Sequence, residues 1–124
     1  MKNDFNLRAD LHLHSHIGMR LWYCPLLYDS VQSVETILAR ALELGLDIIS
    51  ITDHDSLEGY LKAKKIIDEK NLNLTLVPGI EVSSKDGHIL AYGVDKVVES
   101  GLTAAETVER IHRLGGGRRR RPSL

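Results

Sequence analysis

Two histidines stand two positions apart, at His12 and His14, in a segment of alternating apolar and polar residues (7–14). Such alternation predicts a β-strand, because successive side chains of a strand point to opposite faces. The two imidazoles would then share one face and can bind one metal ion. Asp10 falls on the same face, where it can accept the Nδ–H of a ligand histidine and orient the ring. The alternative is a partly exposed polar strand face, since His-x-His also occurs by chance.

A second cluster surrounds His54, which lies between Asp53 and Asp55 directly after the apolar, β-branched run 46–52. That run predicts a short buried strand. Catalytic residues of α/β folds gather where parallel strands end, so His54 is a candidate for chemistry. The alternative is an acidic turn in which Asp55 or Ser56 caps the next helix, but capping does not account for the histidine.

Glu81 and His88 extend this pattern along the chain. Glu81 follows a predicted strand (72–77) that Pro78 and Gly79 interrupt, with 80–83 as its continuation, and His88 opens a predicted strand over 88–94. Taken singly, such a glutamate is usually solvated and such a histidine is usually structural. Four consecutive strand ends that each supply a histidine or glutamate are a stronger signal. Nitrogen and carboxylate ligands in this mixture suit Zn²⁺, Mn²⁺ or Fe²⁺ rather than Ca²⁺.

Three amphipathic segments are predicted to be helices that position these strands. The first spans 31–44 with Ser30 or Ser33 as its cap, and the second runs from Ser56 to about residue 70. The third begins with the capping box that Thr103 and Glu106 form. Because helical crossovers join parallel strands, the order β-α-β-α-β-β-α predicts an α/β domain with a mainly parallel sheet and flanking helices.

Composition narrows the classes of protein. The chain has 124 residues and a net charge of −1, which suits one ordered domain. Four of its 16 basic residues form the run 118–121, which leaves 12 basic against 17 acidic residues and argues against a generally basic nucleic-acid-binding face. No apolar run is long enough to span a bilayer, so no membrane partner is expected. Cys24 is the single cysteine, which fits a cytoplasmic location.

Taken together, the four segments resemble the PHP family, named for polymerase and histidinol phosphatase. The matching residues are Asp10-Leu-His12-Leu-His14-Ser15, Thr52-Asp53-His54-Asp55-Ser56, Gly79-Ile-Glu81-Val and Gly87-His88-Ile-Leu. The resemblance covers roughly residues 6 to 116. The chain is most similar to stand-alone metal-dependent phosphoesterases, which include 3′,5′-nucleotide bisphosphate phosphatases and 5′→3′ exonucleases on short oligonucleotides.

The resemblance implies the N-terminal part of a distorted (β/α)7 barrel with two or three divalent ions (Mn, Zn or Fe). It places His12 and His14 on one ion, Glu81 between that ion and a second, His88 on the second and His54 on a third. Asp53 would contact these ligand residues without binding an ion itself. Glu81 and His54 are the implied catalytic residues: a metal-bound hydroxide attacks phosphorus, and either His54 or a family histidine that this chain lacks can protonate the leaving oxygen.

The sequence departs from the family pattern in two places. The usual Ser-Asp-Gly after the first motif is absent, with His16 or Asp29 as substitutes, and Arg20 is a candidate contact for a second phosphate. The long stretch 15–31 is expected to be a binding loop or lid. Family members continue into a strand ending in His-Pro and a later Asp-x-His, whereas this chain turns to Gly117-Arg-Arg-Arg-Arg-Pro-Ser-Leu. We therefore expect residues 1–116 to form the N-terminal portion of a PHP domain and 117–124 to be a disordered or artefactual tail.

Three functions stay open from the sequence. The first is a phosphoesterase acting on nucleotides or short oligonucleotides. The second is a phosphatase for a small metabolite such as histidinol phosphate, which would use the same ligands. The third is a non-catalytic PHP fragment, and by itself the chain is expected to hydrolyse phosphate esters poorly. The oligomeric state is not predicted.

Overall fold

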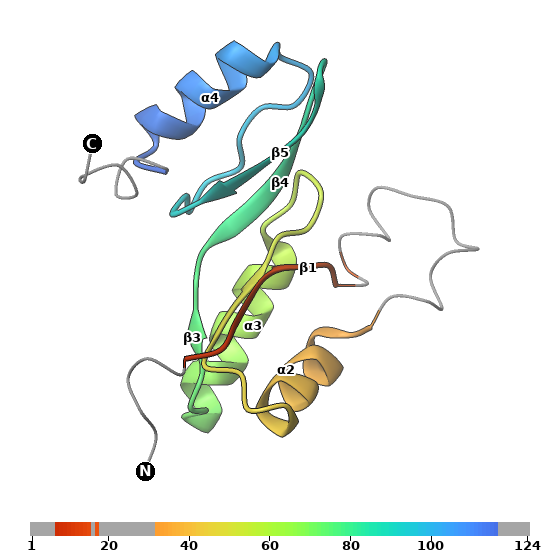
Figure 1. Ribbon diagram of the computed structural model, residues 1–124, viewed down its shortest axis with the longest axis vertical. Coiled ribbons are helices and arrows are strands. Elements are labelled where there is room, and N and C mark those ends of the chain that lie inside the picture. Colours follow the sequence, from red (N-terminus) through yellow and green to blue (C-terminus); the bar gives the residue numbers. More distant parts are fainter. Residues whose placement is uncertain (1–6, 16, 18–31, 117–124) are drawn as a thin grey trace.

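The computed structural model describes residues 7–15, 17 and 32–116 (Figure 1). The expectations for His16, Arg20, Cys24 and Asp29, for most of the stretch 15–31 and for the tail 117–124 concern residues outside these ranges. None of the described helices is long and apolar enough to cross a membrane.

A three-stranded parallel sheet forms one part of the molecule. Its strands are β1 (Ala9–Leu13), β2 (Ile48–Ile51) and β3 (Thr75–Leu76), in that spatial order. The crossovers are α2 (Val34–Glu43) and α3 (Glu58–Lys70). Both helices pack with β2 in one hydrophobic cluster, which includes the fully buried Ile49. The predicted α/β class, with a parallel sheet and flanking helices, is confirmed.

The helices begin and end close to the predicted positions. The Ser33 hydroxyl caps α2 by accepting the Thr36 N–H, which selects Ser33 over Ser30. Ser56 accepts the Glu58 N–H at the start of α3, over a distance of 3.2 Å. The helix α4 (Ala104–Arg113) carries the predicted capping box, in which Thr103 and Glu106 bond to each other's backbone. Ser33 and Thr103 thus cap their helices with side chains, whereas the N-cap residue of α3 is Leu57 and Ser56 lies one residue before it.

An antiparallel hairpin forms the second part. It consists of β4 (Gly79–Ser84) and β5 (Gly87–Tyr92), and α4 packs against it (Figure 1). The expectation that 80–83 extends the preceding strand beyond a kink holds only in part: Glu81 keeps a parallel bridge to His54, but β4 is a separate strand in a second sheet. Pro78 has no N–H to continue a ladder, and β4 leaves β3 to pair with β5 instead. Gly87 allows the tight turn because its φ of +126° is one that other residues rarely adopt.

The two parts meet along one line of backbone bonds. The Glu81 N–H donates to the Asp53 carbonyl at 3.0 Å, and the Asp55 N–H donates back to the Glu81 carbonyl at the same distance. Asp55 reaches this position with a left-handed φ of +52°. On the other side of the hairpin, the Tyr92 hydroxyl donates to the Leu11 carbonyl. The loop after β2 is thereby fixed beside the middle of β4.

The strand β1 contains an irregularity beside its histidines. Asp10 is opposite Ile49 and Leu13 is opposite Ile51, so β1 uses three steps where β2 uses two. One extra residue in a ladder is a β-bulge, and such bulges change the direction in which nearby side chains point. The bulge therefore falls on the segment that carries His12.

Candidate metal centre

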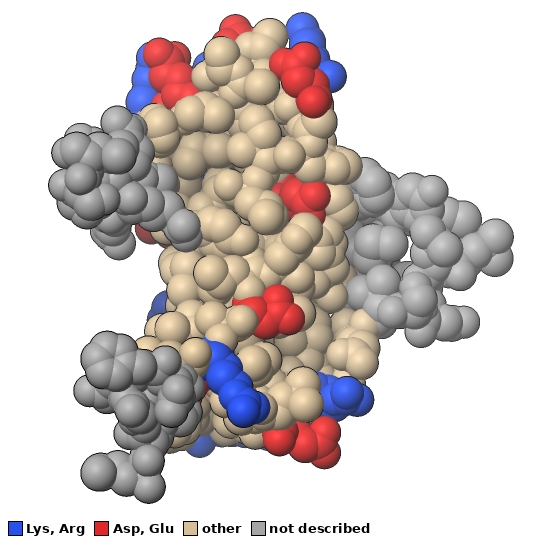
Figure 2. Space-filling model, viewed as in Figure 1, with Lys and Arg blue, Asp and Glu red and all other residues tan. Residues whose placement is uncertain are grey.

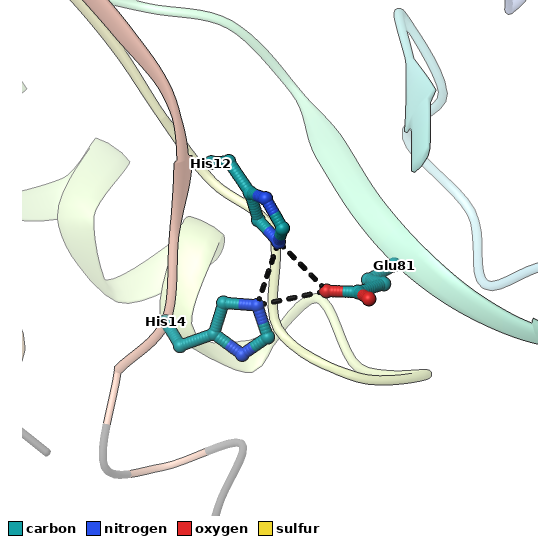
Figure 3. A group of neighbouring side chains, drawn as sticks. All are labelled: His12, His14 and Glu81. Carbon is teal, nitrogen blue, oxygen red and sulfur yellow. Dashed lines mark hydrogen bonds and ion pairs between the residues drawn. The ribbon is translucent and has the colours of Figure 1, made fainter. Parts of the chain in front are cut away.

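Three side chains converge on one point: His12 of β1, His14 directly after β1, and Glu81 of β4 (Figure 3). The Nε2 atoms of His12 and His14 lie 2.9 Å and 2.8 Å from Glu81 Oε1, and 3.1 Å from each other. A tetrahedral ion with bonds of about 2.0–2.1 Å has its ligand atoms about 3.3 Å apart. The triangle of ligand atoms is thus close to the size of one face of such a site.

A second group forms around the other oxygen of Glu81. His88 Nδ1 lies 3.6 Å from Glu81 Oε2. Ligand atoms of His54, Glu81 and His88 all lie within 4.8 Å of one another, and the rings of His54 and His88 are 4.7 Å apart. Glu81 therefore belongs to both groups and directs one oxygen toward each. The resemblance implies that His54 binds a third ion, whereas its position here is beside Glu81 and His88.

The hairpin register explains how Glu81 and His88 meet. His88 is directly opposite Ser83, which is two residues beyond Glu81 on the same strand. Residues two apart share a face of a strand, so Glu81 and His88 are diagonal neighbours on one face. The expectation that each ligand lies at a strand end needs correction for Glu81, which is the third residue of β4 and does not follow a strand. His88 is the second residue of β5, which lies at this edge because β5 runs antiparallel to β4.

The first pair of histidines follows the predicted alternation, since His12 of β1 and His14, directly after β1, both point their rings toward Glu81 (Figure 3). Asp10 does not contact an imidazole nitrogen as predicted. Its carboxylate accepts the backbone N–H of His12 at 3.2 Å rather than a ring N–H. Because the bulge exposes this N–H, Asp10 stabilises the irregular backbone instead of orienting an imidazole.

Burial and charge prepare these groups for cation binding. Burial alone would raise the pKa of Glu81, but the hydrogen bond from His12 and the charges of His54, His14 and His12 outweigh it, so the pKa is lowered. Burial lowers the pKa of His54, with His14 and His88 acting in the same direction against Glu81 and Asp55. At neutral pH these shifts favour a charged Glu81 and a neutral His54, the forms in which both bind metals.

The two aspartates beside His54 hold the surrounding segments in place. Asp53 accepts two hydrogen bonds from Ser15, one from the backbone N–H and one from the hydroxyl. Asp55 accepts the Ser83 N–H at 2.9 Å. The sequence indicated Asp53 only through the resemblance, and it did not indicate Ser83 as a partner at all. Asp53 and Ser15 are 38 positions apart in the sequence, and Asp55 and Ser83 are 28 apart, so no local sequence pattern predicts either contact.

Solvent reaches the ligand cluster from two directions. The side chains of His12 and His88 are 50% and 43% exposed. A groove of about 540 Å³ opens beside His54, between the start of α3 and residues 95–97. Its lining includes three carboxylates and one amine, from Asp55, Glu58, Asp95 and Lys96. The sequence offered no motif for the loop 95–97, because nothing in its composition links it to His54.

The donor set fits divalent ions. Four histidines and one buried carboxylate supply nitrogen and oxygen atoms, a mixture that suits Zn²⁺, Mn²⁺ or Fe²⁺. Each group supplies three protein ligands, and three-ligand sites characteristically leave a position open for water or substrate. The arrangement is therefore suited to hydrolysis at two neighbouring ions.

Several known proteins are similar to part of this sequence. An uncharacterized protein of Methanocaldococcus jannaschii is 32% identical over 111 residues, which cover 89% of this chain and 64% of that protein. The 5′-3′ exoribonuclease Rnm of Salmonella typhimurium is 30% identical, over 75% of this chain and 30% of its own length. Phosphoribosyl 1,2-cyclic phosphate 1,2-diphosphodiesterase of Eggerthella lenta is 29% identical over 83% of this chain and 37% of that enzyme. The chain thus spans from about a third to under two thirds of these relatives.

A solved structure agrees with the fold. A two-domain protein from Bacteroides vulgatus, which contains a predicted PHP-like metal-dependent phosphoesterase, superposes with a TM-score of 0.68. The match has 18% identity and covers 89% of this chain and 33% of that one. The sequence also matches the PHP domain family model over residues 10–113, which include all five candidate ligands. A match over so much of the chain shows that it belongs to the PHP domain family.

Proposed function

We propose that this chain carries the metal centre of a phosphoesterase that hydrolyses phosphate esters of nucleotides or short oligonucleotides. The observation that carries the proposal is the sharing of Glu81 between two groups of histidines. A carboxylate that offers one oxygen to each of two sites sets the distance between them. Two divalent ions about 3.5–4 Å apart are a recurring arrangement in phosphatases and nucleases.

The residues of the chain would then have separate tasks. Bound divalent ions would neutralise phosphate charge and lower the pKa of water, which provides the nucleophile. His12 and His14 hold one side of the centre, and His88 holds the other. His54 borders both the cluster and the groove, so among the described histidines it is placed to contact the leaving oxygen. The half-exposed His12 and His88 leave the centre open to a phosphate group.

The nucleotide substrate is supported by the relatives that act on RNA, whose sequences align with this chain in part. The groove beside His54 favours a second candidate, a small-metabolite phosphatase of the kind that acts on histidinol phosphate. Three carboxylates against one lysine would repel the additional phosphates of an oligonucleotide. On the face shown in Figure 2, the lysines and arginines also form no continuous patch.

The proposal is tested by measuring two quantities on the same protein samples: the amount of bound metal and the rate of phosphate release. The chain would be loaded with Mn²⁺ or Zn²⁺ and assayed on a nucleotide 3′,5′-bisphosphate, a short oligonucleotide and a small sugar phosphate. Glu81→Gln is the test variant, and Glu99→Gln is the matched control because Glu99 is an exposed partner of Arg110. We expect slow, chelator-sensitive release that Glu99→Gln retains and Glu81→Gln loses.

Each outcome distinguishes the hypotheses. Faster release from the sugar phosphate than from the oligonucleotide would favour the small-metabolite phosphatase. Two bound ions without release from any substrate would favour a non-catalytic module. Failure to bind ions, or release that Glu81→Gln leaves unchanged, would contradict the proposed function.

A further inference from the structure

A buried carboxylate connects the two loops that carry His14 and His54. Asp53 is 1% exposed and Ser15 is fully buried. Asp53 Oδ1 accepts the Ser15 N–H at 2.6 Å, and Oδ2 accepts the Ser15 hydroxyl at 2.6 Å. Burial of a charged group is unfavourable unless hydrogen bonds compensate for the lost water, so this pair is held firmly together.

Asp53 and Ser15 are adjacent in the chain to two of the candidate ligands. Ser15 directly follows His14, and Asp53 directly precedes His54. The rings of His14 and His54 are 4.6 Å apart, although they follow different strands, β1 and β2. Two parallel hydrogen bonds restrict both the separation and the rotation of the joined segments. Asp53 and Ser15 therefore help to set the distance between the two histidines, together with the bond from the Thr52 N–H to the Leu13 carbonyl at 2.7 Å.

Gly59, in the first turn of α3, provides the space that this pair occupies. A Cβ atom at position 59 would lie 2.2 Å from Asp53 Oδ2 and 2.6 Å from Ser15 Oγ. Both distances are too short for any real contact. Glycine is otherwise unfavourable within a helix, and the close approach of Asp53 gives a physical reason for it here.

We propose that Asp53, Ser15 and Gly59 form a clamp (the Asp53 clamp) that positions His14 and His54 for metal binding before an ion arrives. Asp53 is then a positioning residue, because both of its oxygens accept hydrogen bonds from Ser15 and it belongs to neither group of candidate ligands. The inference rests on the proposed metal centre. Residues that orient metal ligands typically contribute about 10- to 100-fold to metal affinity.

Two buried serines provide a matched test. Ser15→Ala removes the hydroxyl of the clamp, whereas Ser50→Ala removes a hydroxyl that is also fully buried but donates to the Val77 carbonyl at 2.8 Å. We would measure Zn²⁺ affinity by competition with a chelating dye and record the visible absorption spectrum of the Co²⁺-loaded chain. Ser15→Ala should weaken Zn²⁺ binding about 10-fold or more and alter the Co²⁺ spectrum. Ser50→Ala should lower the melting temperature and leave both metal readouts unchanged.

Two further variants separate geometry from charge and from folding. Asp53→Asn keeps an oxygen for the Ser15 N–H and an amide that can donate to the Ser15 hydroxyl, so it should rescue the affinity that Asp53→Ala loses. Gly59→Ala should weaken Zn²⁺ binding even though alanine favours a helix. If Asp53→Ala does not fold, Ser15→Ala and Gly59→Ala still decide the question.

The outcomes also separate the clamp from the proposed function. Equal losses of affinity in Ser15→Ala and Ser50→Ala, or full affinity in Gly59→Ala, would overturn the clamp while leaving the metal centre intact. If the unaltered chain binds no Zn²⁺, the proposed function fails. In that case, the clamp is tested by comparing the ring NMR signals of His14 and His54 between the metal-free unaltered chain and metal-free Ser15→Ala. Signals that Ser15→Ala leaves unchanged would overturn it.

Discussion

The parallel region (residues 7–15, 17 and 32–76) and the hairpin region (79–116) are organised differently. The first contains parallel strands joined by helices, and its hydrophobic cluster lies between α2, α3 and the sheet. The second contains an antiparallel hairpin covered by α4, with a cluster of its own. Only a few residues of the first region, including Leu57 and Tyr60, join the second cluster. Each region thus has its own apolar core.

The candidate ligands are divided between these regions. His12, His14 and His54 come from the parallel region, whereas Glu81 and His88 come from the hairpin region. Each group needs Glu81 together with at least one histidine of the parallel region. The centre therefore lies between two apolar cores, and ion binding would join them.

The largest effect is expected from Glu81→Ala. Glu81 is common to both groups, so its loss should reduce the bound ions from two to none. His88→Ala affects one group only and should leave about one ion. Metal stoichiometry by plasma mass spectrometry of the dialysed protein measures this difference. Two ions retained by Glu81→Ala would show that the hairpin region is not needed for binding.

Removal of the metal should be the next largest effect. An ion that binds only the folded chain at 100 times its Kd adds about 2.7 kcal/mol to the free energy of unfolding. For a domain of this size, chelation should lower Tm by about 10 °C. Hydrogen exchange should also speed up at the amides of residues 81 and 83, which bond across the boundary. A shift of Tm below about 2 °C would argue that the regions are already joined without metal.

Tyr92→Phe should have a smaller effect that does not involve the ions. The variant removes the hydrogen bond from the hairpin region to the Leu11 carbonyl, which should reduce the free energy of unfolding by about 1 kcal/mol. Tyr60→Phe is the matched control, because its hydroxyl forms no hydrogen bond within the described ranges. Urea unfolding of both variants measures the difference. Equal stability of the two would show that this bond does not connect the regions.

The smallest effect is expected at the capping box, which lies within the hairpin region. Hydrogen bonds from the Thr103 backbone and hydroxyl lower the pKa of Glu106 below its usual 4.5. Because the folded pKa is the lower one, this contribution is present above about pH 4.5 and is lost as the pH falls through the folded pKa. Glu106→Gln should therefore lower Tm slightly at pH 7 and much less at pH 3. An unchanged Zn²⁺ affinity would show that this cap does not act on the centre.

The sequence predicts the parallel region better than the hairpin region. Alternation around His12 and His14 correctly placed both rings on one face, because period two depends only on local geometry. Alternation did not show what covers the opposite face, and Leu7 is in fact 57% exposed. The sequence identified Glu81 and His88 as candidate ligands, but it did not predict that they lie on one face of an antiparallel hairpin. Whether two strands pair in parallel or antiparallel order depends on partners distant in the chain, and Pro78 alone did not reveal that β4 leaves the first sheet.

The left-handed backbone of Asp55 has a consequence for sequence variation at that position. Its φ of +52° is accessible to glycine and, among other residues, chiefly to asparagine and aspartate. The Ser83 N–H separately requires a side-chain oxygen at the same place. Glycine meets only the first requirement, and serine or glutamate meets at most the second. In a saturation library selected for an intact centre, position 55 would therefore be confined to aspartate and asparagine.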